Sequence, residues 1–284
     1  MQKFAIITDS DSSISQAMAQ AYDIRLVPIN VHFGDDCYES GIDIDDKSLF
    51  ERVDKENKLP TTAAPTPGLF QSAFRKAFQD GYDHILCFCV SSKISATYAS
   101  AQQAKEILES DRITVVDTET VSLGQGFIVL EAAEQARAGK SLEEILATAE
   151  RVRDNMHLFA ALSTLKYLAM GGRISHLQAG MAGIMEVKPI LTTLDGKLEV
   201  LERIRTRKKS LSRLLELVEE SLGGAKIERM GIIQADCEDE AAVFCEVVRD
   251  YFHYEGDIPI VEFTPGLSVH SGKGLLGLAV YTAV

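Results

Sequence analysis

The chain has 284 residues, 46% of them hydrophobic and 25% charged, which allows one large domain or two ordinary ones with a substantial core. Its formal net charge of −13 argues against nucleic acid and anionic membrane surfaces as main partners. No apolar run is long enough to span a bilayer, no signal peptide precedes the first apolar segment, and none of the five cysteines forms a CxxC pair. We therefore expect a cytoplasmic protein with reduced thiols.

The first half of the chain alternates between apolar, strand-like runs and helical patterns. Strands are predicted at residues 4–7, 24–33, 84–90 and 113–116, and helices at 14–22, 46–56, 68–81, 98–108, 124–139 and from 142 onward. Ser141 and Glu144 form a capping box at the start of the last helix. Regular alternation of this kind predicts a parallel sheet flanked by helices.

The second half has a different pattern. Strands predicted at 187–194 and 198–204 flank Asp195-Gly196, which is a strong hairpin signal. Further strands are predicted at 227–234 and 275–282, with helices at 208–222 and 238–254. This mixture predicts an α+β domain with antiparallel strands. The fold class is therefore α/β with two domains, residues 1–155 and 156–284.

A hydroxyl-rich stretch, residues 91–97, follows the apolar run at 84–90 and precedes a predicted helix. In an open α/β sheet this is the rim where ligands bind, and the first helical turn offers free N–H groups to an anion. Serine and threonine are also favoured at helix starts when nothing binds there. Both interpretations, an anion site and a plain cap, fit the spacing.

Four loops are expected at the carboxyl edge of the parallel sheet: residues 8–13, 61–67, 91–97 and 118–126. They contain many hydroxyls, no histidine and few charged groups. Such a set is poor for general acid–base chemistry but suited to holding an anion.

Three other segments carry charged or titratable groups, each with an ordinary structural alternative. Gly171-Gly172-Arg173 could hold a guanidinium near an anion, or be a helix stop before a surface arginine. His270 lies beside a flexible turn and could be structural. The basic run 203–209 suggests a phosphate-bearing or protein partner, or a solvated face.

One enzymatic alternative comes from Asp9-x-Asp11, which follows the first predicted strand. It resembles the opening of a Mg²⁺-dependent phosphohydrolase with an aspartyl nucleophile. Such an enzyme also needs a lysine and a later acidic pair at strand ends, and neither can be placed convincingly.

Taken together, the motifs resemble those of the DegV family across nearly the whole chain. They are Thr8-Asp9-Ser10, Thr62 with Pro65, Ile94-Ser95-Ala96-Thr97-Tyr98, Asp117 with 122–126, Leu168 with Gly171-Gly172-Arg173-Ile174-Ser175, 188–191, Arg205-Thr206 and His270. The resemblance implies a two-domain fold with one long-chain fatty acid in a tunnel between the domains. It also implies a carrier, not an enzyme, which needs no cofactor or metal and presents the acid to a fatty acid kinase for acyl-phosphate formation and phospholipid synthesis.

The same resemblance implies residue roles. Thr62 and Ser95 would hold the carboxylate, Arg173 and His270 would support the head group, and Arg205 would serve the kinase. This chain departs from the family pattern at Ala96, at Ala63-Ala64 and at Lys273. Lys273, where the family usually has proline, bears on how His270 is positioned.

Overall fold

The fold is described from a computed structural model that covers residues 2–172 and 187–283. Arg173, one of the predicted head-group residues, lies outside the described residues. The chain divides into two compact units, one of residues 1–44 and 60–154, the other of residues 45–59 and 155–284. No helix in the described ranges has the length and apolar character needed to cross a membrane.

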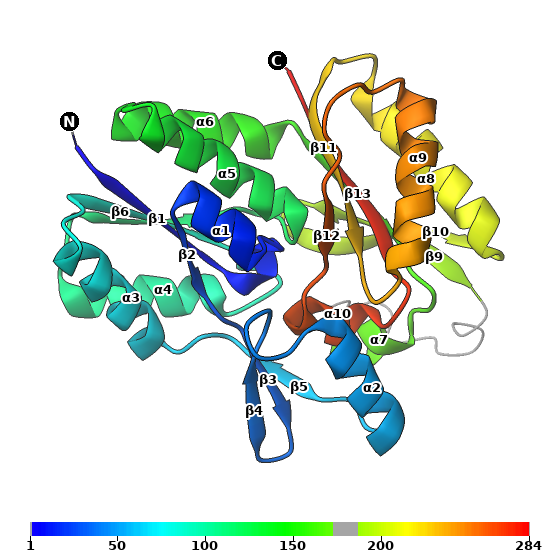
Figure 1. The fold of residues 1–284 in the computed structure, drawn as a ribbon, viewed down its shortest axis with the longest axis horizontal. Helices are drawn as coiled ribbons and strands as arrows, with labels where there is room; N and C mark the ends of the chain where they lie inside the picture. The colour runs from blue at the N-terminus through cyan, green and yellow to red at the C-terminus, as the bar shows by residue number, and fades with distance from the viewer. Residues whose placement is uncertain (1, 173–186, 284) are drawn as a thin grey trace. The chain divides into compact units, whose positions relative to one another are not determined.

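Unit 1 contains a four-stranded parallel sheet in the order β2-β1-β6-β7 and a small antiparallel sheet in the order β4-β3-β5. Figure 1 labels the elements along the chain. They are β1 (Phe4–Asp9), the short 3-10 helix η1 (Ser10–Ser12), α1 (Gln16–Tyr22), β2 (Ile24–Val27), β3 (Asn30–Phe33), β4 (Asp36–Glu39), β5 (Thr61–Ala63), α3 (Pro67–Gln79), β6 (His84–Cys89), α4 (Thr97–Leu108), β7 (Ile113–Asp117), α5 (Leu123–Arg137) and α6 (Leu142–Asp154).

The parallel sheet of unit 1 is buried on both faces, as the unbroken apolar run of β6 predicts. Alternate residues of β1, β6 and β7 pack against Phe70 and Phe74 of α3 and Ala101 and Ala104 of α4. Helix α5 lies against the other face of the sheet (Figure 1), and its residues 123–133 are all buried. The predicted capping box is confirmed, because the Ser141 amide donates to Glu144 and the Glu144 amide to Ser141 Oγ.

The prediction of a single strand at residues 24–33 is wrong in one respect. It is divided into β2 and β3, which belong to different sheets. The division falls at Pro28, which has no N–H to give to a sheet ladder and fixes its own φ. The predicted loop at 61–67 likewise begins with β5, which pairs with β3.

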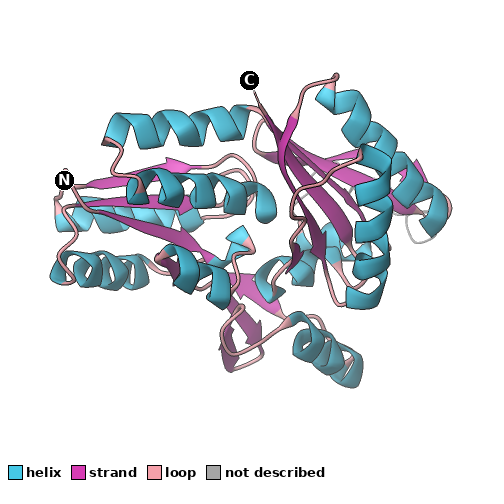
Figure 2. Cartoon of the chain, turned by 45° about the horizontal axis from the view of Figure 1, so that its top comes forward, coloured by secondary structure: helices cyan, strands magenta, loops and turns pink. Residues whose placement is uncertain are grey.

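Unit 2 contains a six-stranded mixed sheet in the order β10-β9-β8-β13-β11-β12, antiparallel except for the β11–β12 pair. Figure 2 shows the strands and helices by type. The elements are α2 (Asp46–Glu56), β8 (Met156–Ala161), α7 (Lys166–Gly171), β9 (Lys188–Leu194), β10 (Lys197–Ile204), α8 (Arg207–Leu222), β11 (Ile227–Gln234), α9 (Glu238–Phe252), β12 (Ile260–Glu262), α10 (Pro265–Ser271) and β13 (Leu276–Thr282). The predicted hairpin around Asp195-Gly196 is confirmed as β9–β10.

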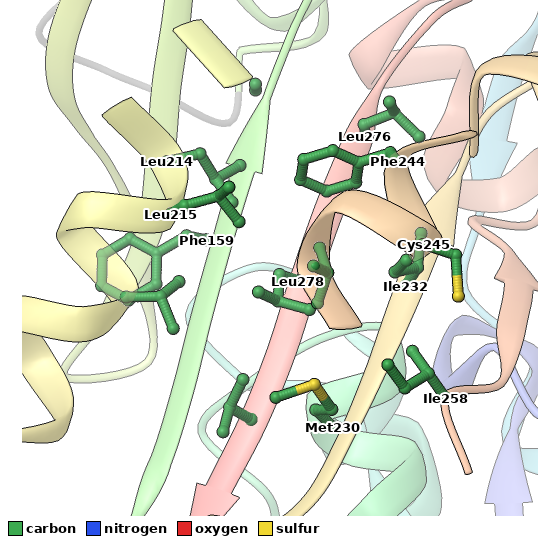
Figure 3. Packing of buried hydrophobic residues seen from close by; sticks show 14 of the residues in the cluster. Phe159, Leu214, Leu215, Met230, Ile232, Phe244, Cys245, Ile258, Leu276 and Leu278 are labelled. Carbon is green, nitrogen blue, oxygen red and sulfur yellow. The ribbon is translucent and has the colours of Figure 1, made fainter. Parts of the chain in front are cut away.

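The core of unit 2 lies between its sheet and helices α8 and α9. Figure 3 shows Phe159, Leu276 and Leu278 of the sheet beside Leu214 of α8 and Phe244 of α9. The apolar face of each helix recurs every three to four residues, which is why both were predicted from the sequence.

Helix α2 belongs to unit 2, although its residues precede most of unit 1 in the sequence. The Asp46 amide donates to Glu262 of β12, and Ser268 Oγ of α10 donates to Asp46 Oδ2 at 2.8 Å. Leu49 and Phe50 are buried on the same helix. These contacts all lie within unit 2. A division of the chain into residues 1–155 and 156–284 would instead assign Asp46 to one domain and its partners Glu262 and Ser268 to the other.

Candidate functional site

Three of the four loops expected at the carboxyl edge of the parallel sheet are joined by hydrogen bonds. The Ser122 amide donates to the Asp11 carbonyl at 2.8 Å, and Ser13 Oγ and Ser122 Oγ lie 2.8 Å apart. The Ser91 amide donates to the Thr120 carbonyl at 3.0 Å. The strand-end hydroxyls of unit 1 are therefore gathered at one edge, where α/β sheets bind their ligands.

Asp9, at the end of β1, connects the loops at this edge through hydrogen bonds to its carboxylate. Its carboxylate accepts hydrogen bonds from the Asp11 amide at 3.0 Å, the Val90 amide at 2.8 Å and Gln125 Nε2 at 3.2 Å. The side chain is wholly buried, and this burial raises the pKa of Asp9 to about 6 despite the three donors. Asp9 therefore fixes the start of the loop that runs from Val90 to Ser95.

The same geometry does not favour the phosphohydrolase alternative. Both oxygens of Asp9 are already engaged by amide donors, and the side chain has no exposed surface for a substrate. Within residues 2–172 and 187–283, no group of three or more histidine, cysteine, aspartate or glutamate side chains is arranged to hold a metal ion.

Ser95 lies in the loop between β6 and α4 and is half-buried. Its Oγ accepts the Thr97 amide at 3.3 Å and lies 2.8 Å from Thr97 Oγ1. The cap interpretation of the sequence therefore holds in part, since Ser95 bonds one amide at the start of α4. It does not exclude a ligand, because Ser95 is only half-buried.

Thr62 is the second predicted carboxylate ligand and lies in the same unit as Ser95. It is half-buried on β5, where it pairs with Val31 of β3 in the small sheet. The sequence placed this residue in a loop stiffened by prolines. A three-residue strand between Pro60 and Pro65 is too short to show a periodic pattern.

His270 and Arg205, both in unit 2, have different surroundings. His270 is half-buried on α10 and faces Gly171 of α7. Arg205 is exposed between β10 and α8. Within the basic run 203–209, Arg207 forms an ion pair with another residue of unit 2. Its guanidinium donates to both carboxylate oxygens of Glu240 at 2.9 Å.

Replacing Gly171 with alanine is expected to destabilise the protein by about 1–3 kcal/mol, the usual cost of overpacking. A Cβ at this position would overlap Nδ1 of His270. The free energy of unfolding, measured by chemical denaturation, checks this. In a His270→Ala background the substitution should cost much less, because the overlapping ring is gone. An equal cost in both backgrounds would contradict the assignment.

Comparison with known proteins places the chain in a family. The profile described as "Uncharacterised protein, DegV family" matches residues 3–283. Protein DegV of Bacillus subtilis is 34% identical over 281 aligned positions, and the match covers 96% of this chain and 97% of that protein. A DegV domain-containing protein of Deinococcus radiodurans is 34% identical over 279 residues, 97% of each chain.

Two solved structures have the same fold over their whole length. The fatty-acid-binding DegV family protein of Thermus thermophilus has a TM-score of 0.89 at 31% identity, covering 99% of this chain and 100% of that one. DegV of Bacillus subtilis, described as a fatty acid binding protein, has a TM-score of 0.87 at 33% identity and covers 100% of both chains. The chain therefore belongs to the DegV family, as the motifs from Thr8 to His270 predicted.

Proposed function

We propose that this protein is a carrier that binds one long-chain fatty acid in a buried tunnel and is not itself an enzyme. The observation that carries the proposal is the full-length match to two DegV structures described as fatty acid binding, at 31% and 33% identity. The hydroxyl-rich edge of the parallel sheet in unit 1 supports the proposal. Hydroxyls can bind an anion, and this edge carries few groups suited to acid–base catalysis.

Thr62 and Ser95 are proposed to hold the carboxylate of the acid by their hydroxyls. An isolated carboxylate cannot enter an apolar cavity without donors. The alkyl chain supplies most of the free energy, since burying about 15 methylenes at about 0.8 kcal/mol each gives about 12 kcal/mol before ordering costs. Neutral donors leave the bound carboxylate nucleophilic toward a phosphoryl group.

We assign Arg173 and His270 to the support of the head group, and Arg205 to a partner fatty acid kinase that forms the acyl phosphate for phospholipid synthesis. Arg203, Arg205, Lys208 and Lys209 are all exposed, which favours a contact with an acidic or phosphate-bearing partner. Phosphoryl transfer needs positively charged groups that stabilise the negative charge on the phosphoryl oxygens in the transition state.

All five cysteines are free thiols, which favours the cytoplasm as the compartment.

Native mass spectrometry of the purified protein tests the proposed function. We expect one long-chain fatty acid per chain, either co-purified or taken up after the protein is stripped of lipid and mixed with palmitate. Extraction under denaturing conditions should release the same acid. A chain that stays empty after palmitate is added would contradict the proposal.

A further inference from the structure

Thr97 is the buried neighbour of the proposed ligand Ser95 at the start of α4. Its side chain has no exposed surface, whereas that of Ser95 is half-buried. The Thr97 hydroxyl lies 2.8 Å from Ser95 Oγ, which is its only hydrogen-bond partner among the described residues. A buried hydroxyl rarely leaves its proton unbonded, so the direction of this bond can be worked out by counting protons.

A serine hydroxyl has one proton to donate and two lone pairs to accept with. One lone pair of Ser95 Oγ accepts the Thr97 amide at 3.3 Å. The Thr97 proton has no other acceptor within the described chain, so it is directed to the second lone pair. Ser95 is then left with a single function toward a ligand, the donation of its own proton.

We infer that Thr97 is a positioning residue that makes Ser95 an obligate hydrogen-bond donor and so selects an anionic acceptor over a hydroxyl head group. The inference rests on the proposed function, because it assumes that Ser95 meets the head group of a lipid. A fatty acid carboxylate accepts the Ser95 proton. A fatty alcohol must also donate its own proton, and Ser95 has no lone pair left for it.

Hydrogen bonds in series strengthen one another, so accepting two bonds also makes Ser95 a better donor. The carboxylate bond is charge-assisted and gains most from this. Removing the Thr97 hydroxyl therefore weakens carboxylate binding and frees a lone pair that can accept from an alcohol. Both changes lower the preference for the acid.

The test uses the full chain stripped of lipid, with palmitate and the fatty alcohol of the same length as probes. Dissociation constants are measured by displacement of a fluorescent fatty acid. In Thr97→Val, which keeps the shape and the backbone amide but removes the hydroxyl, we expect the ratio of acid to alcohol affinity to fall about tenfold, the upper end for the loss of one neutral hydrogen bond. Thr97→Ser should restore the ratio of the unmodified protein.

A double-mutant cycle with Ser95→Ala separates positioning from general damage. If Thr97 acts through Ser95, Thr97→Val should not change the ratio when Ser95 is already alanine. An unchanged ratio in Thr97→Val alone, or an equal fall in both backgrounds, would overturn the inference while leaving the proposed function intact. Failure of the unmodified protein to bind palmitate would overturn the proposed function, and this inference with it. Should Thr97→Val unfold, Thr97→Ala removes the same hydroxyl and serves in the same cycle.

Discussion

Thr62→Ala combined with Ser95→Ala is expected to weaken binding of a long-chain fatty acid at least about a hundredfold. In the proposed site each hydroxyl donates to a charged carboxylate, and one such bond contributes about 1.5–3 kcal/mol, so that the loss of two gives about 3–6 kcal/mol. Isothermal titration of palmitate into lipid-free protein measures the loss. Both side chains are half-buried, and neither belongs to the apolar clusters that stabilise the units, so the fold should persist.

The chain offers a matched control for this double variant. Thr66 and Ser92 lie in the same two segments, are exposed, and Thr66 makes no side-chain cap bond to α3. Thr66→Ala combined with Ser92→Ala removes the same number of hydroxyls and should bind palmitate as the unmodified protein does. Equal affinity in the test and control variants would show that Thr62 and Ser95 are not the carboxylate ligands.

Asp9→Ala is expected to lower the free energy of unfolding by about 3–5 kcal/mol. The substitution leaves the amides of Asp11 and Val90 buried without an acceptor and removes one of the two acceptors of Gln125 Nε2. Each unsatisfied buried donor costs about 1–3 kcal/mol. Denaturant unfolding followed by circular dichroism measures the loss.

Asp117→Ala is the control for this effect, because Asp117 ends β7 of the same sheet and also accepts two amides, from Ser92 at 3.2 Å and Glu119 at 3.1 Å. It is only half-buried, so water can replace its oxygens and the loss should be about 1 kcal/mol. A loss at Asp9 no larger than that at Asp117 would show that Asp9 does not hold the edge of the sheet together.

The pH dependence of stability separates the charge of Asp9 from its shape. Burial raises the pKa of Asp9 from 3.8 to about 6, so the proton is bound more tightly in the folded chain. The resulting stabilisation is fully present below pH 3.8 and is lost as the pH rises through about 6. The free energy of unfolding of the unmodified protein should therefore fall relative to that of Asp9→Asn as the pH rises across this window. The expected fall is about 3 kcal/mol, because each pKa unit corresponds to about 1.36 kcal/mol.

The sequence predicts the elements whose pattern is local. The apolar run of β6, the Asp195-Gly196 turn and the Ser141 capping box each depend on a few adjacent residues, and all three are found in the structure. Strand β4 was not predicted, because Asp36–Glu39 is polar and has no buried face to produce an alternating pattern. The segment is a strand because it pairs with β3, and its own composition does not show that pairing.

The same distinction applies to the candidate site. The excess of hydroxyls in residues 91–97 identifies the loop, but it does not show which hydroxyl is exposed to a ligand and which one orients it. Thr97 is buried and Ser95 is not, although both are small polar residues at the start of one helix. That difference arises from the path of the backbone into α4, which composition does not encode.

The placement of α2 in unit 2 has a consequence for synthesis of the chain on the ribosome. Asp46 is made 216 residues before Glu262 and 222 before Ser268, the two residues that anchor it. Unit 1 is complete once residue 154 has emerged, whereas unit 2 must wait for its last strands and for helix α10. Closing so long a loop is slow, so unit 2 should mature last and depend most on chaperones during translation.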